Sequence, residues 1–311
     1  MGRGPAVIEN SCRRNGQPRE GGGARGERKP TWFERDRSKL IGSEYAFRVG
    51  KAGVMEQQHG ILIIGHGSEQ SPGPLVSASG HAERLMESGR FAEARVAFLM
   101  AGEDPRDQLE AMRARTIHVI PLFMCDGYYT RTVIPKTLGL QGTRTSRDGS
   151  LLIYGTPIGM HPGMAEILRL RTLETCRAAG WTPSRTRLVV IGHGSPKSPA
   201  SAEVTRRHAG EIGRRSEFLA VECAFIDEAP KIEDWLRDLP TEGPPVVLAG
   251  FFAADGLHSS LDIPGWIEAW ENRTGSRPGA RVRYTGAVGA DERVTALIAE
   301  SIATETALQL P

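Results

Sequence analysis

The sequence has few cysteines and no long hydrophobic run, and each shortage excludes a class of protein. Its four cysteines are scattered over 311 residues without a Cys-x-x-Cys pair, which argues against a disulfide framework and a thiolate zinc site. No apolar run approaches the ~18 residues that a membrane-spanning helix needs, and no basic segment precedes a signal-peptide core. We therefore expect a soluble, cytoplasmic protein without a membrane partner.

Nucleotide-binding and hydrolase motifs are also missing. Neither Gly-x-x-x-x-Gly-Lys-Ser/Thr nor Gly-x-Gly-x-x-Gly follows either of the two strongest apolar strands, so no nucleotide is expected. The tetrapeptide Gly-His-Gly-Ser, at residues 65–68 and 192–195, resembles the oxyanion loop of an α/β hydrolase. A serine esterase would need a nucleophile elbow, Gly-x-Ser-x-Gly, and the sequence has none.

Residues 1–54 differ in composition from the rest of the chain. They carry twelve Lys or Arg against six acids, a net charge of +6, and residues 55–311 carry −4. Without apolar periodicity this segment cannot bury enough surface to offset its ordering entropy, so we expect a disordered basic tail. Its acids and glycines argue against a nucleic-acid arm. We hypothesise that the native product starts at Met55, which an N-terminal mass including residues 1–54 would contradict.

The rest of the chain repeats its own pattern. An apolar strand at residues 61–64 runs into Gly65-His66-Gly67-Ser68, and a second at residues 188–191 runs into Gly192-His193-Gly194-Ser195, 127 positions later. Other landmarks recur at offsets of 127 to 130, which indicates a duplication with small loop insertions. They are Ala97-Phe98-Leu99 and Ala224-Phe225-Ile226, Asp126-Gly127 and Asp255-Gly256, Ile134-Pro135 and Ile263-Pro264, and Gly159 and Gly289.

Each copy alternates short apolar runs with amphipathic stretches, the pattern of a parallel sheet covered by helices on both faces. We therefore predict an α/β fold with two tandem four-stranded open sheets, repeat 1 at residues 55–182 and repeat 2 at residues 183–311. Strands are predicted at residues 60–65, 94–100, 116–124, 150–155, 186–192, 218–226, 245–252 and 280–285. Helices are predicted at residues 75–89, 105–114, 162–179, 199–215, 230–238 and 291–308.

Two histidines of repeat 2 should meet at one edge of this fold. Ligands of open parallel sheets bind outside the carboxyl ends of the strands, where both His193 and His258 are expected. A pair of neutral imidazoles suits Co²⁺, Fe²⁺, Ni²⁺ or Zn²⁺ and can also accept protons. Asp227 ends the neighbouring strand and should point to the same edge, with Glu228 as the adjacent alternative.

In these motifs the sequence resembles the CbiX and sirohydrochlorin-chelatase family in its long, two-copy form. The matching pieces are the strand with Gly-His-Gly-Ser, a Phe-x-acid segment before a proline, and Gly-x-His-x-x-x-Asp-Ile-Pro, and they extend over residues 59–308. The resemblance implies tandem chelatase-like domains and a lyase that inserts a divalent metal into sirohydrochlorin or a related tetrapyrrole in cobalamin or sirohaem biosynthesis. It makes His193 and His258 catalytic metal ligands, and it makes Asp227, where the family usually has Glu, the acidic catalytic residue that orients an imidazole or relays the proton outward.

The same resemblance implies that the metal is a substrate, Co²⁺ first with Fe²⁺ or Ni²⁺ as alternatives, and that no cofactor is permanently bound. Repeat 1 departs from the family pattern, because Tyr129 stands at the position of His258 and Met100 at that of Asp227. A phenol is a poor base at pH 7 and a thioether cannot replace a carboxylate, so repeat 1 is expected to support the substrate. The expected substrate-binding residues are Gly194, Ser195, Ser259, Ser260, His66 and Tyr129.

Other features leave alternatives open. Arg131, Lys197, Arg206 and Arg207 are candidate partners for the carboxylates of a tetrapyrrole. A non-catalytic tetrapyrrole or metal carrier is the alternative function, because the site of repeat 1 is lost. The metal and the oligomeric state, monomer or homodimer, are not fixed by the sequence.

Overall fold

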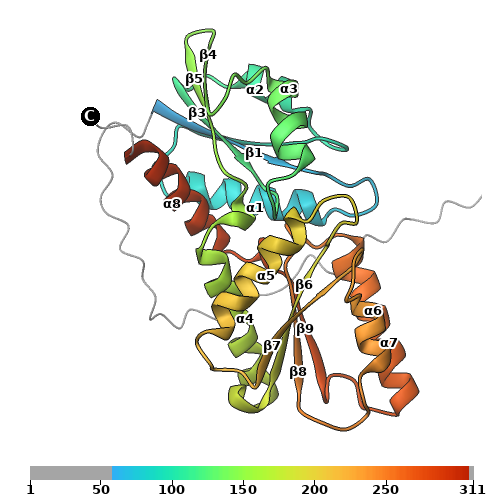
Figure 1. The fold of residues 1–311 in the computed structure, drawn as a ribbon. Helices are drawn as coiled ribbons and strands as arrows, with labels where there is room; N and C mark the ends of the chain where they lie inside the picture. Colours follow the sequence, from blue (N-terminus) through green and yellow to red (C-terminus); the bar gives the residue numbers. More distant parts are fainter. Residues whose placement is uncertain (1–57, 308–311) are drawn as a thin grey trace, which may run out of the picture. The chain divides into compact units, whose positions relative to one another are not determined.

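The computed structural model describes residues 58–307, all within one compact unit, and the predictions for residues 1–54 and for Met55 lie outside the described residues. Strands of this part form two sheets (Figure 1). The first holds β1 (His59–Gly65), β2 (Glu93–Phe98), β3 (Thr116–Pro121), β4 (Arg144–Arg147) and β5 (Ser150–Tyr154). The second holds β6 (Arg187–Gly192), β7 (Ala220–Phe225), β8 (Val246–Gly250) and β9 (Val282–Ala287).

Both sheets place their Gly-His-Gly-Ser strand in the centre. The strand orders are β2-β1-β3-β5-β4 and β7-β6-β8-β9, and the eight predicted strands pair in parallel, which confirms the α/β prediction. The side chains of residues 61–64 in β1 and 188–191 in β6 are all fully buried. Strands buried on both faces are apolar without alternation, which is why these two were so evident in the sequence.

The prediction of four strands in the first sheet was wrong by one. β4 pairs antiparallel with β5 through a turn at Asp148 and Gly149, both with positive φ. This is the backbone of a type I′ hairpin, for which Asp-Gly is a preferred sequence. The strand itself was missed because its residues, Arg-Thr-Ser-Arg, carry no apolar alternation.

Six of the helices confirm the predicted ones, and two were missed. The missed helices, α3 and α7, each begin at an Ile-Pro pair that directly follows a π-helical turn. Proline is favoured at the first positions of a helix, so each Ile-Pro pair marks a helix start, although the two pairs had been used only as evidence of the repeat.

Within residues 58–307 no helix is both long and apolar enough to cross a membrane. The helices are α1 (Gly73–Glu87), α2 (Pro105–Ala111), α3 (Ile134–Leu138), α4 (Gly163–Ala179), α5 (Ala200–Gly213), α6 (Ile232–Asp238), α7 (Ile263–Thr274) and α8 (Val294–Ala307).

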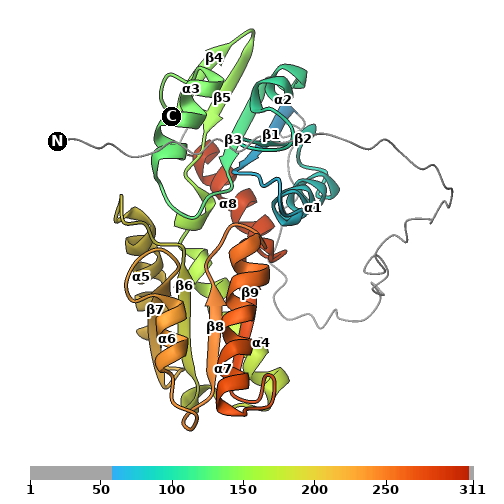
Figure 2. The ribbon, with the colours of Figure 1, turned by 90° about the vertical axis from the view of Figure 1, so that its right-hand side faces the viewer.

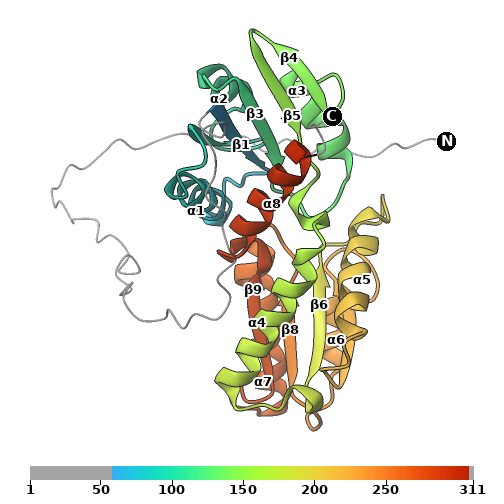
Figure 3. The same cartoon turned by 90° about the vertical axis from the view of Figure 1, so that its left-hand side faces the viewer.

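The last helix of each repeat packs on the other repeat. Although α4 follows the first sheet in sequence, it packs against α5, β8 and β9, while α8 packs against α1 (Figures 2 and 3). One hydrophobic cluster accordingly joins side chains from both repeats, among them Ile63, Met164, Val190 and Ile298. The helices that cover each sheet therefore do not all come from the same repeat as the sheet itself.

Two buried histidines at equivalent positions join the repeats. In α1, His81 Nε2 lies 2.8 Å from the carbonyl oxygen of Gly289, in the short 3-10 turn before α8. In α5, His208 Nε2 lies 2.8 Å from the carbonyl oxygen of Gly159, in the matching turn before α4. A ring nitrogen that faces a carbonyl must carry the proton, so both side chains are held as donors.

Candidate functional site

The loop that carries His193 depends on the glycine after it. β6 ends at Gly192, so His193 lies at the carboxyl edge of the second sheet, where it is half-exposed. Gly194 has φ +71°, and a Cβ there would lie 2.6 Å from Glu228 Cγ and 3.0 Å from Phe225 Cβ. Both the left-handed backbone and this close approach require glycine. Because Gly194 has no side chain, Glu228 can pack against the loop while the His193 imidazole stays accessible.

His258 reaches the same edge on a π-helical turn, His258–Asp262, that follows β8. The ring centroids of His193 and His258 are 5.2 Å apart, with 79° between the ring planes. The prediction that residues 65 positions apart meet at one sheet edge is therefore matched by the structure. π-helical turns are rare and are frequent at functional sites.

A carboxylate lies at the Nδ1 side of each imidazole. Asp262 Oδ2 is 2.6 Å from His258 Nδ1, and Asp227 Oδ2 is 3.5 Å from His193 Nδ1, whose other neighbour is the Gly194 carbonyl oxygen at 3.1 Å. Such acceptors keep the proton on Nδ1 and leave the Nε2 lone pair for a ligand or a proton. Asp262 belongs to the Gly-x-His-x-x-x-Asp-Ile-Pro motif, but the sequence had suggested no role for it. The sequence signal that could have identified Asp262 is its position four residues after His258, because side chains four residues apart lie next to each other on a helical turn.

The two adjacent acids Asp227 and Glu228 have different environments. Asp227 is about half-exposed beside His193, and its backbone N–H donates to the His193 carbonyl oxygen at 2.9 Å. Glu228 Oε2 accepts from the backbone N–H of Ser195 at 2.9 Å, and its other oxygen accepts from Arg206 at 3.1 Å. Asp227 thus faces the imidazole, while Glu228 braces the loop.

The structure does not support the expected role of Ser259 in substrate binding. Ser259 is 4% exposed, and its hydroxyl donates to Asp255 Oδ1 at 2.7 Å and lies 2.8 Å from Tyr284 Oη. Asp255 Oδ1 also accepts from the Ala287 backbone N–H at 2.9 Å. These contacts fasten the π-helical turn to β9, so Ser259 supports His258 from inside. The neighbouring Ser260 is exposed.

Repeat 1 keeps the geometry of this site with other side chains. His66 and Tyr129 have ring centroids 4.9 Å apart and ring planes at 88°, and Tyr129 opens a π-helical turn as His258 does. The backbone N–H of Met100 donates to the His66 carbonyl oxygen at 2.9 Å, the same bond that Asp227 makes to His193. The loop after His66 also reaches repeat 2, where Ser71 Oγ donates to the Asp255 carbonyl oxygen at 3.0 Å.

The candidate cations differ in their partners. Arg131 pairs with Asp126 at 2.8 Å, Arg206 with Glu228 at 3.1 Å, and Arg207 donates to the Met160 carbonyl oxygen. Lys197 is exposed two residues beyond Ser195. A guanidinium carries five N–H donors, so each of these three arginines has donor capacity beyond that one bond.

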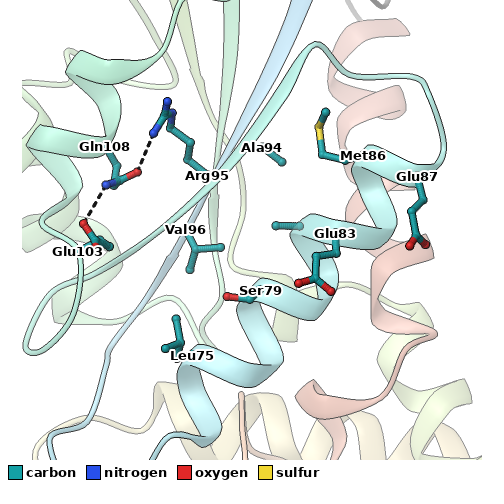
Figure 4. Close-up of a pocket in the computed structure, with 11 residues that line it drawn as sticks. Leu75, Ser79, Glu83, Met86, Glu87, Ala94, Arg95, Val96, Glu103 and Gln108 are labelled. Carbon is teal, nitrogen blue, oxygen red and sulfur yellow. Dashed lines mark hydrogen bonds between the residues drawn. The ribbon is translucent and has the colours of Figure 1, made fainter. Parts of the chain in front are cut away.

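A hollow of about 620 Å³ lies elsewhere, between α1, β2 and the start of α2 (Figure 4). Arg95, Gln108 and Glu103 form a hydrogen-bonded chain along its wall. None of the residues that line it is a predicted site residue. Among the described residues, no group of three or more His, Cys, Asp or Glu is arranged to hold a metal ion.

The chain also matches known proteins in sequence. The CbiX family model matches residues 60–175 and again residues 187–305. A probable sirohydrochlorin cobaltochelatase of Halobacterium salinarum is 31% identical over 221 residues, which cover 66% of this chain and 75% of that protein.

Two solved structures share the fold. A CbiX described as the terminal enzyme for biosynthesis of siroheme in denitrifying bacteria is 28% identical with a TM-score of 0.60, covering 79% of this chain and 98% of that one. A multi-domain Deinococcus radiodurans protein with structural similarity to chelatases has a TM-score of 0.67 at 23% identity. The match covers 79% of this chain but only 55% of that longer protein. Because the family model matches twice and covers most of the described residues, this protein belongs to the CbiX family of metal chelatases.

Proposed function

We propose that the chain inserts a divalent metal ion into sirohydrochlorin or a related tetrapyrrole, on a route to cobalamin or sirohaem. The observation that carries the proposal is the pair of half-exposed imidazoles, 5.2 Å apart, each with a carboxylate at its Nδ1 side. Co²⁺ is the proposed metal, because the Halobacterium relative is named a cobaltochelatase. Fe²⁺ and Ni²⁺ remain alternatives, since imidazole suits all three ions.

Insertion requires that two pyrrole N–H protons leave the macrocycle while the metal ion sheds water. His193 and His258 would bind the ion through Nε2 and receive protons as the ring nitrogens replace them. Asp262 and Asp227 would orient each imidazole and stabilise the imidazolium that forms, because a carboxylate at Nδ1 attracts its positive charge. Two protein ligands leave most of the coordination shell open, which suits an ion that is to be passed on.

The substrate would rest on residues around this pair, of which Ser260 is exposed, Ser195 is half-buried and Gly194 is buried. Gly194 and Ser195 border His193, and Ser260 follows His258 on the π-helical turn. From repeat 1, His66 and Tyr129 are proposed to support the macrocycle. Ser259 is not included, because its hydroxyl is buried and bonded to Asp255.

The direct experiment is an insertion assay with metal-free sirohydrochlorin and a panel of Co²⁺, Fe²⁺ and Ni²⁺, followed by absorbance. We expect the fastest enzyme-dependent insertion with Co²⁺. If the purified protein binds sirohydrochlorin but leaves insertion of every ion at the spontaneous rate, the protein is a carrier and the proposal fails.

Replacing Gly194 with Ala is expected to lower the insertion rate by about tenfold or more. The new Cβ would meet Glu228 and Phe225 and would add about 1–2 kcal/mol of left-handed backbone strain, so the loop must shift His193. Gly256→Ala is the matched control, because a Cβ at Gly256 meets nothing within 4 Å although the residue lies two positions before His258. Equal rates for the two variants would show that the loop tolerates a side chain at position 194.

A further inference from the structure

We propose that the degenerate site of repeat 1 is a binding surface for the tetrapyrrole itself, in which Tyr128, Tyr129 and Met100 contact the flat face of the macrocycle and Arg131 binds its peripheral carboxylates. This inference rests on the proposed function. In this proposal repeat 1 recognises the tetrapyrrole and repeat 2 binds the metal ion.

The aromatic part of the surface is continuous. Tyr129 packs edge-on against His66 at 4.9 Å, against Tyr128 at 5.8 Å, and is stacked with Phe123 at 6.1 Å. Tyr128 is nevertheless 70% exposed. The contacts among these rings hold Tyr129 in place, while Tyr128 presents its ring to a ligand.

Met100 lies next to His66, the residue whose ring contacts Tyr129. Its side chain is 61% exposed, and its backbone N–H bonds to the His66 carbonyl oxygen at 2.9 Å. A flexible, polarisable thioether adapts to aromatic partners. Contiguous exposed apolar side chains of this kind are typical of binding sites.

Comparison with repeat 2 shows what has changed. At the positions of Met100, Tyr128 and Tyr129, repeat 2 has Asp227, Leu257 and His258, and Tyr129 and His258 each open a π-helical turn. Where repeat 2 has a carboxylate, a leucine and an imidazole, repeat 1 has a thioether and two phenol rings. Simple loss of a metal site does not require aromatic replacements, whereas a surface for a conjugated ring does.

Arg131 supplies the positive charge that would bind the carboxylates of the tetrapyrrole. Its side chain is exposed and bonds through Nε to Asp126 at 2.8 Å, which leaves its terminal N–H groups for an anion. It lies on the same π-helical turn as Tyr129, and repeat 2 has Ser260 at the equivalent position. A planar ring next to a fixed guanidinium matches a planar polycarboxylate such as sirohydrochlorin.

The test is equilibrium binding of metal-free sirohydrochlorin to the full chain, measured by fluorescence quenching, beside binding of Co²⁺ alone by calorimetry. Tyr128→Ala and Tyr129→Ala should each raise the Kd for sirohydrochlorin about tenfold, as expected for loss of a stacked ring, and should leave the Kd for Co²⁺ unchanged. Arg131→Gln should raise the Kd several-fold and make binding less sensitive to salt.

Two matched controls remove similar side chains elsewhere. Leu219→Ala deletes another exposed apolar side chain, and Arg106→Gln deletes an arginine that is also exposed and paired with an aspartate. Both should bind sirohydrochlorin like the wild type. If the wild type inserts metal but the tyrosine variants bind as tightly as these controls, the inference is overturned and the proposed function stands. If the wild type does not bind sirohydrochlorin, the proposed function fails as well.

Discussion

Replacing His258 or His193 with Ala is expected to lower the rate of metal insertion at least about 100-fold, the range found when a positioned general base is lost. The two rings lie 5.2 Å apart, so in the proposed mechanism removal of either would leave the metal ion with one protein ligand and the leaving protons with one acceptor. The measurement is the initial rate of insertion into sirohydrochlorin, with Co²⁺ binding measured in parallel. Affinity for Co²⁺ should fall together with the rate.

The matched control is His66→Ala, which removes a histidine from the same tetrapeptide in repeat 1. His66 faces Tyr129 in place of a second imidazole, so its loss should cost far less than the loss of His193. Asp262→Asn should give an intermediate effect of roughly 10–100-fold in metal affinity, because the carboxylate acts through His258. If His66→Ala were as damaging as His258→Ala, the metal would belong to both repeats.

Most of the fold was accessible from the sequence because the duplication shows every pattern twice. The central strands were evident since β1 and β6 are buried on both faces, and the edge to which His193 and His258 converge follows from parallel topology. The exchange of α4 and α8 was not predictable, because an amphipathic stretch shows that a helix has a buried face but not which sheet covers that face.

The chemistry of the site was less accessible than its position. Asp262 lies in the same motif as His258, and its contact with His258 follows from the i,i+4 spacing once this segment is known to be helical, but no helix had been predicted there. Ser259 was predicted to bind the substrate, yet the turn directs its hydroxyl inward to Asp255. Neighbours in sequence point in different directions on a helical turn, so proximity in sequence to a candidate catalytic residue is weak grounds for assigning a role.

The free energy of unfolding should fall markedly between pH 7.5 and pH 5, because three buried histidines are held neutral. Burial lowers the pKa of His118 in β3 to about 4, and its close neighbour His59, 2.9 Å away, adds to this effect. Burial also lowers the pKa of His81 and His208, although each ring meets a backbone carbonyl. Protonation of His208 would place a charge at Nδ1, a buried atom with no hydrogen-bond partner among the described residues.

The sign of the effect follows from linkage between protonation and folding. A histidine whose pKa is lower in the folded protein than in the unfolded chain takes up its proton on unfolding, so acid favours the unfolded state. The loss begins as the pH falls through about 6.5, the ordinary histidine pKa, and for His118 it ends near pH 4. At pH 5, His118 alone should account for about 2 kcal/mol, and His81 and His208 add to it.

Urea unfolding at the two pH values measures this loss, and amide variants separate its sources. Glutamine at position 81 or 208 can still donate to the carbonyl of Gly289 or Gly159 but does not titrate, so His81→Gln and His208→Gln should each lose less stability between pH 7.5 and pH 5 than the wild type. His118→Gln should remove the largest share. A pH-independent free energy of unfolding in the wild type would mean that these rings bind protons in the folded protein, and the joint between the two repeats would then have to accommodate charge.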